Sequence, residues 1–581
     1  MKKVASALSA ILILTLLMLS FPYPVRGQTI NAAFIVNTIE DTHDENVGDG
    51  VCVDEFNKCS LRAAMEEAID LFNNHATMTT ITFGFTGPQT IYLDNELPYN
   101  SPANIIGPND LSVTIDGQNI AGLSHGIYLN FSSSTTIKNL RLQHFSYAAI
   151  SSGNYFGHHT IERNIIVNNA MRGIFVSGYQ AFPSSGSISI NNNFIGYDPI
   201  FEVPGPNGRH GIELDALDFS STGSAINISG NVISGNVGCG IFVKSQDIDA
   251  ETIIQGNTIG TNDFGTVAVP NGGGICVDRH AGLLTIGADT AAEGNLVSGN
   301  NQEGIKVSRA VNFTIQNNNL STNASGTAFL PNGDEDIYLY DSTLGSVSDN
   351  VALQGISIHG SESQPVTELS ILRNYVGITR SGFVRPLTTN MSGIYATYMH
   401  EACKIGFNRI TGFRSGIYIG EGTFTNITSN KIFDTSGLGI EIPPWGTNPN
   451  DYLDADTGPN FMQNFPSLTV VKTDFSSYKT YDITAKLHST PNTLFRVEVF
   501  SSDVCFIGGY GDGEEIERTS NAVRTDGSGN ATWQVETLYS WEIVGECFTA
   551  TASKVLGDGL YGSTSEFSRQ VNHLYLPTIL R

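Results

Sequence analysis

A strand motif, Gly-Ile-x-apolar-y, recurs along this chain of 581 residues, and acidic and basic side chains alternate at its last position, y. Successive side chains of a strand point to opposite faces, so x and y point outward when the apolar pair points inward. β-Elimination on a sugar acid needs acids that hold a metal ion and a base that removes the α-proton. A ladder of exposed charges that only keeps the surface soluble is the alternative, so catalytic residues stay unassigned. The candidates at or just after y are Asp215, Lys244, Asp278, Arg279, His280 and Arg309.

The x positions form a second outward stripe, which contains Tyr338, Tyr395 and Tyr418, with Ser357 between the first two. Exposed aromatic rings on a strand face stack on sugar rings, because they offer apolar area with a polar tip. Inserted loops that cover the tyrosines are the alternative. Either way, the stripe favours a carbohydrate-binding surface over a reaction centre.

Side chains that offer hard oxygen ligands are interspersed with other residues in the segment from Asn450 to Asn460. Asp451, Asp454, Asp456 and Asn460 lie at alternating spacing, and Gly458 allows a tight turn. The pattern is typical of part of a calcium loop, although the later glutamate and the flanking helices of an EF-hand are missing. Two interpretations stay open: a solvated acidic linker, or a loop in which these side chains bind calcium as a cofactor.

The seven cysteines are interpreted as structural. Cys52 and Cys59 close a short loop, and Cys505 and Cys547 are a plausible second pair near the C-terminus. Three more belong to the repeats, and one cysteine must stay unpaired whatever the connectivity. Without CxxC spacing or a histidine cluster, a zinc site is not predicted.

Ten Asn-x-apolar motifs, each followed by a Gly-Ile-type strand, must position these side chains. They begin at Asn164, Asn193, Asn231, Asn257, Asn295, Asn318, Asn350, Asn374, Asn408 and Asn430. Short apolar strands at such a period, without helical patterning, indicate a solenoid whose coils stack their Ile and Val residues. Stacked asparagines also bond one another along the axis. The prediction is an all-β right-handed parallel β-helix.

The chain ends differ from the repeats. Lys2, Lys3 and an apolar run predict a secretory signal, with a membrane anchor as the alternative. Ser60 is a good N-cap for a short amphipathic helix that covers the open end of the solenoid. Longer alternating strands after residue 466 predict a β-sandwich. The predicted segments are a signal peptide (1–27), a cap (28–80), a β-helix (81–445), an acidic linker (446–466), a β-sandwich (467–571) and an apolar tail (572–581).

The cap carries a family resemblance. Gly48-Asp-Gly-Val-Cys52 followed by Cys59-Ser-Leu-Arg-Ala-Ala64 resembles the CSLREA domain, which begins many secreted bacterial β-helix proteins, although Ala63 replaces the family's glutamate. Over residues 35–442 the chain is similar to pectin-lyase-like folds. The resemblance implies architecture and not activity, because that fold hosts lyases, hydrolases, epimerases, esterases, tailspikes and adhesins.

Composition limits the partners. The chain has 56 acidic and 30 basic residues, for a net charge of −26, which argues against nucleic acid or an anionic membrane. No transmembrane segment is expected after signal removal. We expect a secreted or cell-surface, non-catalytic scaffold that binds polysaccharide or a cell-surface glycan, or mediates adhesion. The alternatives are a calcium-dependent polysaccharide lyase or epimerase and a purely structural filament subunit.

Overall fold

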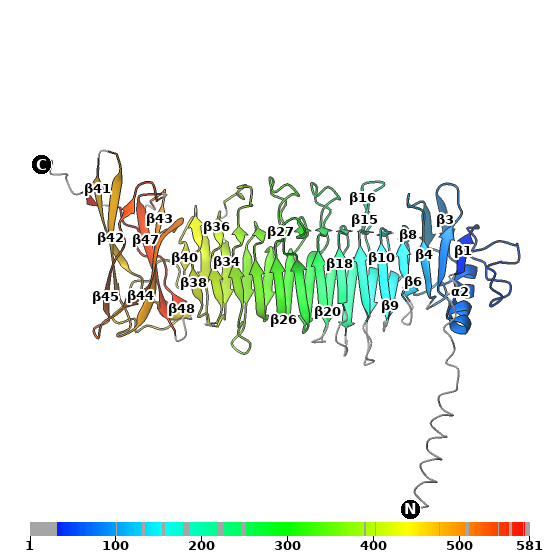
Figure 1. The fold of residues 1–581 in the computed structure, drawn as a ribbon, viewed down its shortest axis with the longest axis horizontal. Coiled ribbons are helices and arrows are strands. Elements are labelled where there is room, and N and C mark those ends of the chain that lie inside the picture. Colours follow the sequence, from blue (N-terminus) through cyan, green and yellow to red (C-terminus); the bar gives the residue numbers. More distant parts are fainter. Residues whose placement is uncertain are drawn as a thin grey trace, which may run out of the picture.

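The computed structural model describes residues 32–575, apart from 100, 130–133, 154–156, 178–185, 218–224, 246–250, 388–390, 401, 476, 506–510, 544, 557–560 and 573. The predicted signal peptide and most of the predicted apolar tail lie outside the described residues. Most of the described chain forms one long rod of stacked coils (Figure 1), with a helix at its N-terminal end and a β-sandwich at the other.

Each coil contributes strands to parallel sheets, which we name A, B and C. Sheet A contains β1 (Ala32–Val36), β2 (Thr79–Phe83), β4 (Ala103–Ile106), β7 (Thr136–Lys138), β10 (His158–Glu162), β13 (Ser187–Asn191), β18 (Ala225–Ser229), β21 (Glu251–Gln255), β24 (Leu283–Gly287), β29 (Thr343–Ser348), β32 (Ser370–Leu372), β35 (Lys404–Gly406) and β38 (Asn426–Thr428).

Sheet B contains β3 (Gln89–Tyr92), β5 (Val113–Asp116), β8 (Arg141–Gln143), β11 (Ile165–Val167), β14 (Phe194–Ile195), β19 (Val232–Ile233), β22 (Thr258–Ile259), β25 (Leu296–Val297), β27 (Asn319–Leu320), β30 (Val351–Ala352), β33 (Tyr375–Val376), β36 (Arg409–Thr411) and β39 (Lys431–Phe433). A two-stranded hairpin, β15 (Tyr197–Asp198) with β16 (Val203–Pro204), projects from one of the longer connections to sheet C.

Sheet C contains β6 (His125–Leu129), β9 (Ala148–Gly153), β12 (Arg172–Ser177), β17 (Ile212–Leu217), β20 (Cys239–Ser245), β23 (Gly273–His280), β28 (Ile337–Tyr340), β31 (Ile356–His359), β34 (Ser392–Thr397), β37 (Ser415–Ile419) and β40 (Ile440–Glu441). The longest strand of the rod, β26 (Ile305–Gln316), pairs first with sheet C and then with sheet A. It therefore joins the two into one 25-stranded sheet.

The interior of the rod consists of apolar columns, because equivalent residues of successive coils pair one to one. In sheet A the column runs Ile81, Ile105, Ile137, Ile161, Ile190, Ile228, Ile254, Ile286, Ile315, Val347, Ile371, Ile405 and Ile427. All of these side chains are buried. A β-branched residue suits every position, since it packs well on a pleated surface.

The ten predicted asparagines form a continuous ladder at the corner between sheets A and B. Each donates its side-chain N–H to the Oδ1 of the next rung at 2.8–3.0 Å, from Asn164 to Asn430. The same Oδ1 also accepts a backbone N–H of the preceding coil, as between Asn257 and Asn231. The predicted side-chain ladder is confirmed.

A second asparagine ladder, which the sequence did not suggest, lies at the corner between sheets B and C. Its rungs bond at 2.8–3.0 Å and are Asn169, Asn207, Asn236, Asn271, Asn300 and Asn332. It ends at Asp336, which accepts from Asn332 at 2.8 Å. Burial raises the pKa of the Asp336 carboxyl to about 6.

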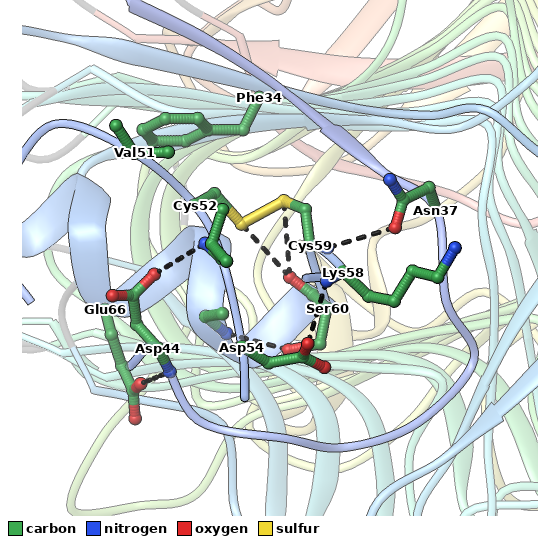
Figure 2. The surroundings of a disulfide bond; sticks show 12 residues. Phe34, Asn37, Asp44, Val51, Cys52, Asp54, Lys58, Cys59, Ser60 and Glu66 are labelled. Atoms are coloured by element: carbon green, nitrogen blue, oxygen red, sulfur yellow. Dashed lines mark hydrogen bonds between the residues drawn. A yellow bond between two sulfur atoms is a disulfide. The ribbon is translucent and has the colours of Figure 1, made fainter. Parts of the chain in front are cut away.

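The N-terminal cap is built around α2 (Leu61–His75), the predicted capping helix. Ser60 is its N-cap and accepts the N–H of Ala63 at 2.9 Å. Figure 2 shows the Cys52–Cys59 disulfide beside this N-cap. The buried Arg62 anchors the helix to the loop before it through Asp41, with N···O distances of 2.7 and 3.0 Å.

The C-terminal sandwich has two antiparallel layers around their own core. The outer layer contains β41 (Ser467–Asp474), β42 (Lys479–His488), β45 (Asn530–Gln534), β46 (Leu538–Tyr539) and the parallel β49 (Leu574–Tyr575). The inner layer contains β43 (Leu494–Ser502), β44 (Glu515–Arg524), β47 (Cys547–Val555) and β48 (Tyr561–Thr564), and it packs on the last coils. A short 3₁₀ turn, η1 (Pro459–Met462), lies in the connection.

Buried carboxylates of the sandwich bond the backbone of the last coils. Glu498 accepts the N–H of Ser429 at 3.2 Å, and Asp512 accepts that of Thr435 at 3.0 Å. Glu566 accepts the N–H of Ile442 at 3.0 Å. A β-helix that simply stopped would leave such groups without partners, so the sandwich closes this end of the rod.

Candidate functional site

The outer face of sheet C carries one unbroken row of x residues, because the strands pair in register along the rod. Aromatic and charged side chains dominate the row. It runs Tyr128, Ser151, Phe175, Glu213, Phe242, Cys276, Lys306, Tyr338, Ser357, Tyr395, Tyr418 and Glu441.

The three predicted tyrosines belong to a stacked aromatic run at the C-terminal end of this face, which we call the C-terminal row. It comprises Tyr338, His359, Tyr395, Tyr418 and Trp445, and neighbouring ring centroids lie 4.9–5.2 Å apart. That spacing matches the strand separation of about 4.8 Å. Tyr395 and Tyr418 are nearly parallel, at 2°.

Neighbouring rings therefore cover much of one another's faces in the C-terminal row, and what remains outward is ring edges and hydroxyl groups. Burial raises the pKa of Tyr338, Tyr395 and Tyr418, so these phenols stay protonated and neutral at physiological pH. Tyr418 packs on Trp445, which is 56% exposed. The Arg414 guanidinium also lies over the Trp445 ring, 3.7 Å from its centroid. The row is thus an array of hydrogen-bonding edges that ends in a partly exposed indole.

Four of the charged candidates at or just after the y position pair with opposite charges from neighbouring coils. Lys244 Nζ lies 3.8 Å from Asp215 Oδ1, and the Arg309 guanidinium bonds the Asp278 carboxylate. All four side chains are half-exposed, so each pair is worth at most about 1 kcal/mol. Asp215 and Asp278 lie two coils apart with Lys244 between them, an order that separates the acids instead of gathering them.

His280 does not lie on the outer face, and that expectation was wrong. The register shifts by one residue here, and Arg279 has a left-handed backbone with φ of 67°. Arg279 is therefore exposed and His280 is fully buried, beside the carbonyl of Gly282 at 3.2 Å and Thr252 Oγ1 at 3.3 Å. Burial lowers the pKa of His280 to about 4, so it is a neutral core residue.

An aromatic cluster at the N-terminal end of sheet C was missed. We call Tyr99, His125 and Tyr128 the N-terminal corner; Tyr147 and Phe175 adjoin it. A usable signal existed, because Gly126-Ile-Tyr-Leu129 repeats the strand motif. It precedes the first asparagine rung and so fell outside the ladder.

Both predicted cysteine pairs form disulfides, Cys52–Cys59 and Cys505–Cys547. A third disulfide, Cys239–Cys276, joins β20 to β23 on the outer face of sheet C. Cys403 is buried and unpaired. Spacing alone could not reveal the third pair, since its two cysteines are 37 positions apart in the sequence and become adjacent only after the chain has completed a coil.

The expected calcium ligands Asp451, Asp454 and Asp456 come together between the rod and the sandwich. Each offers a carboxylate oxygen, and these lie within 4.8 Å of one another. Asp454 accepts from the N–H of Asn464 and from Ser489 Oγ. Buried Oδ1 atoms of Asp451 and Asp456 have no hydrogen-bond partner within the described part of the chain. Burial also raises the pKa of Asp454 and Asp456.

Asn460 takes a different role from the one expected. Its Oδ1 accepts the N–H of Thr425 at 2.7 Å, and its Nδ2 donates to the carbonyls of Thr425 and Thr564. The fully buried Asn460 amide is thus engaged in hydrogen bonds that fasten the linker to the rod and the sandwich. The candidate cation site therefore consists of the three aspartates.

The family model described as a right handed beta helix region matches residues 103–282. No curated protein matches this sequence. Among solved structures, the mannuronan C-5 epimerase AlgE6 A-module of Azotobacter vinelandii is 15% identical, with a TM-score of 0.30, over 73% of this chain and 92% of that one. The enzymatically active domain of bacteriophage CBA120 tailspike protein 2 is 10% identical, with a TM-score of 0.33, over 88% and 74%.

Pectate lyase Pel9A is 13% identical to this chain, with a TM-score of 0.24, over 74% of this chain and 83% of that one. The predicted architecture is confirmed: the described coils form a right-handed parallel β-helix. Among the helices of the described residues, none combines the length and apolarity needed to cross a bilayer.

Proposed function

We propose that the chain is a secreted or cell-surface β-helix scaffold that binds carbohydrate polymers along the outer face of sheet C, without catalysing their cleavage. The observation that carries this proposal is the continuous aromatic and polar row of that face, which includes the C-terminal row. An extended polymer suits a flat surface on which outward side chains recur at the spacing of one coil. Neutral phenols and a solvent-facing indole suit sugar hydroxyls and C–H faces.

A non-catalytic role agrees with the charges of the candidate face. Asp215 pairs with Lys244 and Asp278 pairs with Arg309. His280 is buried in the core. A calcium-dependent lyase or epimerase would need grouped acids and an accessible base at this place. The y row matches the charge-ladder interpretation more closely.

Incubation of the purified chain with neutral and acidic polysaccharides, with and without calcium, tests the proposal. We expect at least one polymer to bind while its length distribution stays unchanged. The double variant Tyr395→Ala/Tyr418→Ala should bind that polymer about tenfold more weakly, because two stacked rings are lost. Calcium-dependent shortening with new unsaturated ends would contradict the non-catalytic role.

We also propose that Asp451, Asp454 and Asp456 hold one calcium ion that fastens the linker. The support is their convergence and the two buried oxygens described above. Calcium at 100 times its Kd should stabilise the fold by about 2.7 kcal/mol. Thermal unfolding with and without 1 mM calcium measures this, and Asp454→Asn should weaken it; Asp434→Asn, outside the cluster, is the matched control. An equal shift in the wild type and Asp454→Asn would rule the site out.

A further inference from the structure

The N-terminal corner differs from the C-terminal row in the way its rings meet. Tyr99 and Tyr128 cross at 65° with centroids 5.3 Å apart. His125 meets Tyr128 at 84° and Tyr99 at 71°. Rings that meet edge to face leave a share of their faces open, whereas parallel rings cover one another. Tyr99 is accordingly 47% exposed.

Hydrogen bonds from the buried Ser151 and the half-buried Glu96 hold the corner in place. Ser151, which is 1% exposed, lies with its Oγ 2.5 Å from His125 Nδ1. Glu96 accepts the backbone N–H of His125 at 2.8 Å and the Tyr99 hydroxyl at 2.5 Å. The His125 Nε2 has no hydrogen-bond partner among the residues that the structure describes. The rings are therefore pre-oriented, which lowers the entropic cost of binding a ligand.

Gly153 makes room for Tyr128. A Cβ added at Gly153 would lie 2.4 Å from the Tyr128 hydroxyl oxygen. No side chain fits there without displacing the ring, so the glycine supports the position of Tyr128. Gly153→Ala is therefore a way to move the ring without deleting it.

The charges around the corner do not attract an anion. Arg172 forms a double hydrogen bond with Glu213 at 2.6 and 3.0 Å, and its guanidinium stacks over Tyr147 and Phe175. Its guanidinium is thus engaged by Glu213, which Arg209 also approaches to 3.5 Å, and Glu96 contributes a negative charge. Burial lowers the pKa of His125, so this ring is neutral at pH 7.

We infer that Tyr99, His125 and Tyr128 form the primary sugar subsite of sheet C, and that it takes an uncharged pyranose unit. The inference rests on the proposed carbohydrate-binding function and deepens it. The open ring faces receive the C–H face of a pyranose, while the Tyr128 hydroxyl and His125 Nε2 bond its hydroxyl groups. A uronate would bring its carboxylate toward Glu96, while the described cations nearby, Arg62 and Arg172, are already paired with Asp41 and Glu213.

Calorimetry of the purified chain at pH 7.5 tests this with hexamers of glucose, mannose and xylose, and with a galacturonic acid hexamer. At least one neutral hexamer should bind, and Tyr99→Ala and Gly153→Ala should each weaken its Kd about tenfold. Phe407→Ala, an exposed aromatic at the corner between sheets A and B, is the matched control and should stay within twofold. Unchanged thermal unfolding of each variant shows that the fold is intact.

Neutral binding that survives Tyr99→Ala and Gly153→Ala but is lost in Tyr395→Ala/Tyr418→Ala would overturn the assignment of the subsite and leave the proposed function standing. Tighter binding of the galacturonic acid hexamer would overturn the preference for an uncharged sugar. Failure of every hexamer and every polysaccharide to bind would overturn both the inference and the proposed function.

Discussion

Replacing Asn257 with alanine is expected to lower the free energy of unfolding by about 3–5 kcal/mol. Asn257 Oδ1 accepts two N–H groups of Asn231, and its Nδ2 donates to Asn295 and to the carbonyls of Ile228 and Gln255. Each buried group left unpaired costs about 1–3 kcal/mol. Several hydrogen-bonding groups lose their partner at once, so the loss of stability exceeds that of an ordinary single substitution.

Urea unfolding followed by circular dichroism measures this effect. Asn74→Ala is the matched control, because Asn74 is exposed near the end of α2 and bonds only Asp70 among the described residues; it should change stability by less than about 0.5 kcal/mol. Equal effects of the two substitutions would show that the ladder contributes nothing beyond an average asparagine.

Glu566→Gln should gain stability relative to the wild type as pH rises, by roughly 3 kcal/mol between pH 4.5 and 8. Burial raises the pKa of Glu566 to about 7, from an ordinary value near 4.5. The folded protein therefore holds a proton that the unfolded chain has released, and stability falls as pH rises through this window. At roughly 1.4 kcal/mol per pKa unit, 2.5 units give the stated size.

The pH dependence of wild-type stability alone does not isolate this effect, because three buried or largely buried histidines shift stability in the opposite direction. Burial lowers the pKa of His159, His210 and His280 to about 4. Their contribution is present above pH 6.5 and is lost as pH falls toward 4. The difference between wild type and Glu566→Gln cancels these histidines, since both proteins contain them.

Thermal unfolding of both proteins from pH 4.5 to 8 gives that difference. Any hydrogen bond that glutamine makes less well adds a constant offset and leaves the slope intact. Glu536→Gln, on an exposed strand connection of the sandwich, should show a difference within about 0.5 kcal/mol at every pH. A flat difference for Glu566→Gln would mean that the carboxyl ionises as readily in the folded protein as in the unfolded chain.

The periodic part of the fold was predictable because one coil obeys the same rules as the next. The Asn164–Asn430 ladder and the inward Ile columns follow from local spacing and the alternation of strand faces. The second ladder was not predicted, because its members from Asn169 to Asn332 fall in connections of unequal length. Spacing along the chain does not show there that the side chains coincide in space.

The candidate site was predictable in position and not in ring geometry. The outward placement of Tyr338, Tyr395 and Tyr418 follows from alternation, but the parallel stacking that covers their faces depends on rotamers and on His359. His280 was misplaced because a single left-handed residue, Arg279, reverses the alternation after it. Such a residue is hard to foresee when it is arginine, since the left-handed region favours glycine.

The sandwich bonds the rod through Glu498, Asp512 and Glu566, and each of these carboxylates reaches a backbone N–H group. Glu498 and Asp512 also accept hydrogen bonds from the side-chain hydroxyls of Thr428 and Thr435 in the last coils. Because these contacts are made with the last coils, the fit of the sandwich on the rod does not depend on how many coils precede them. Duplication or loss of whole coils would therefore change the length of the rod in steps of one coil. The contacts of the helical cap and of the sandwich at the two ends would stay the same.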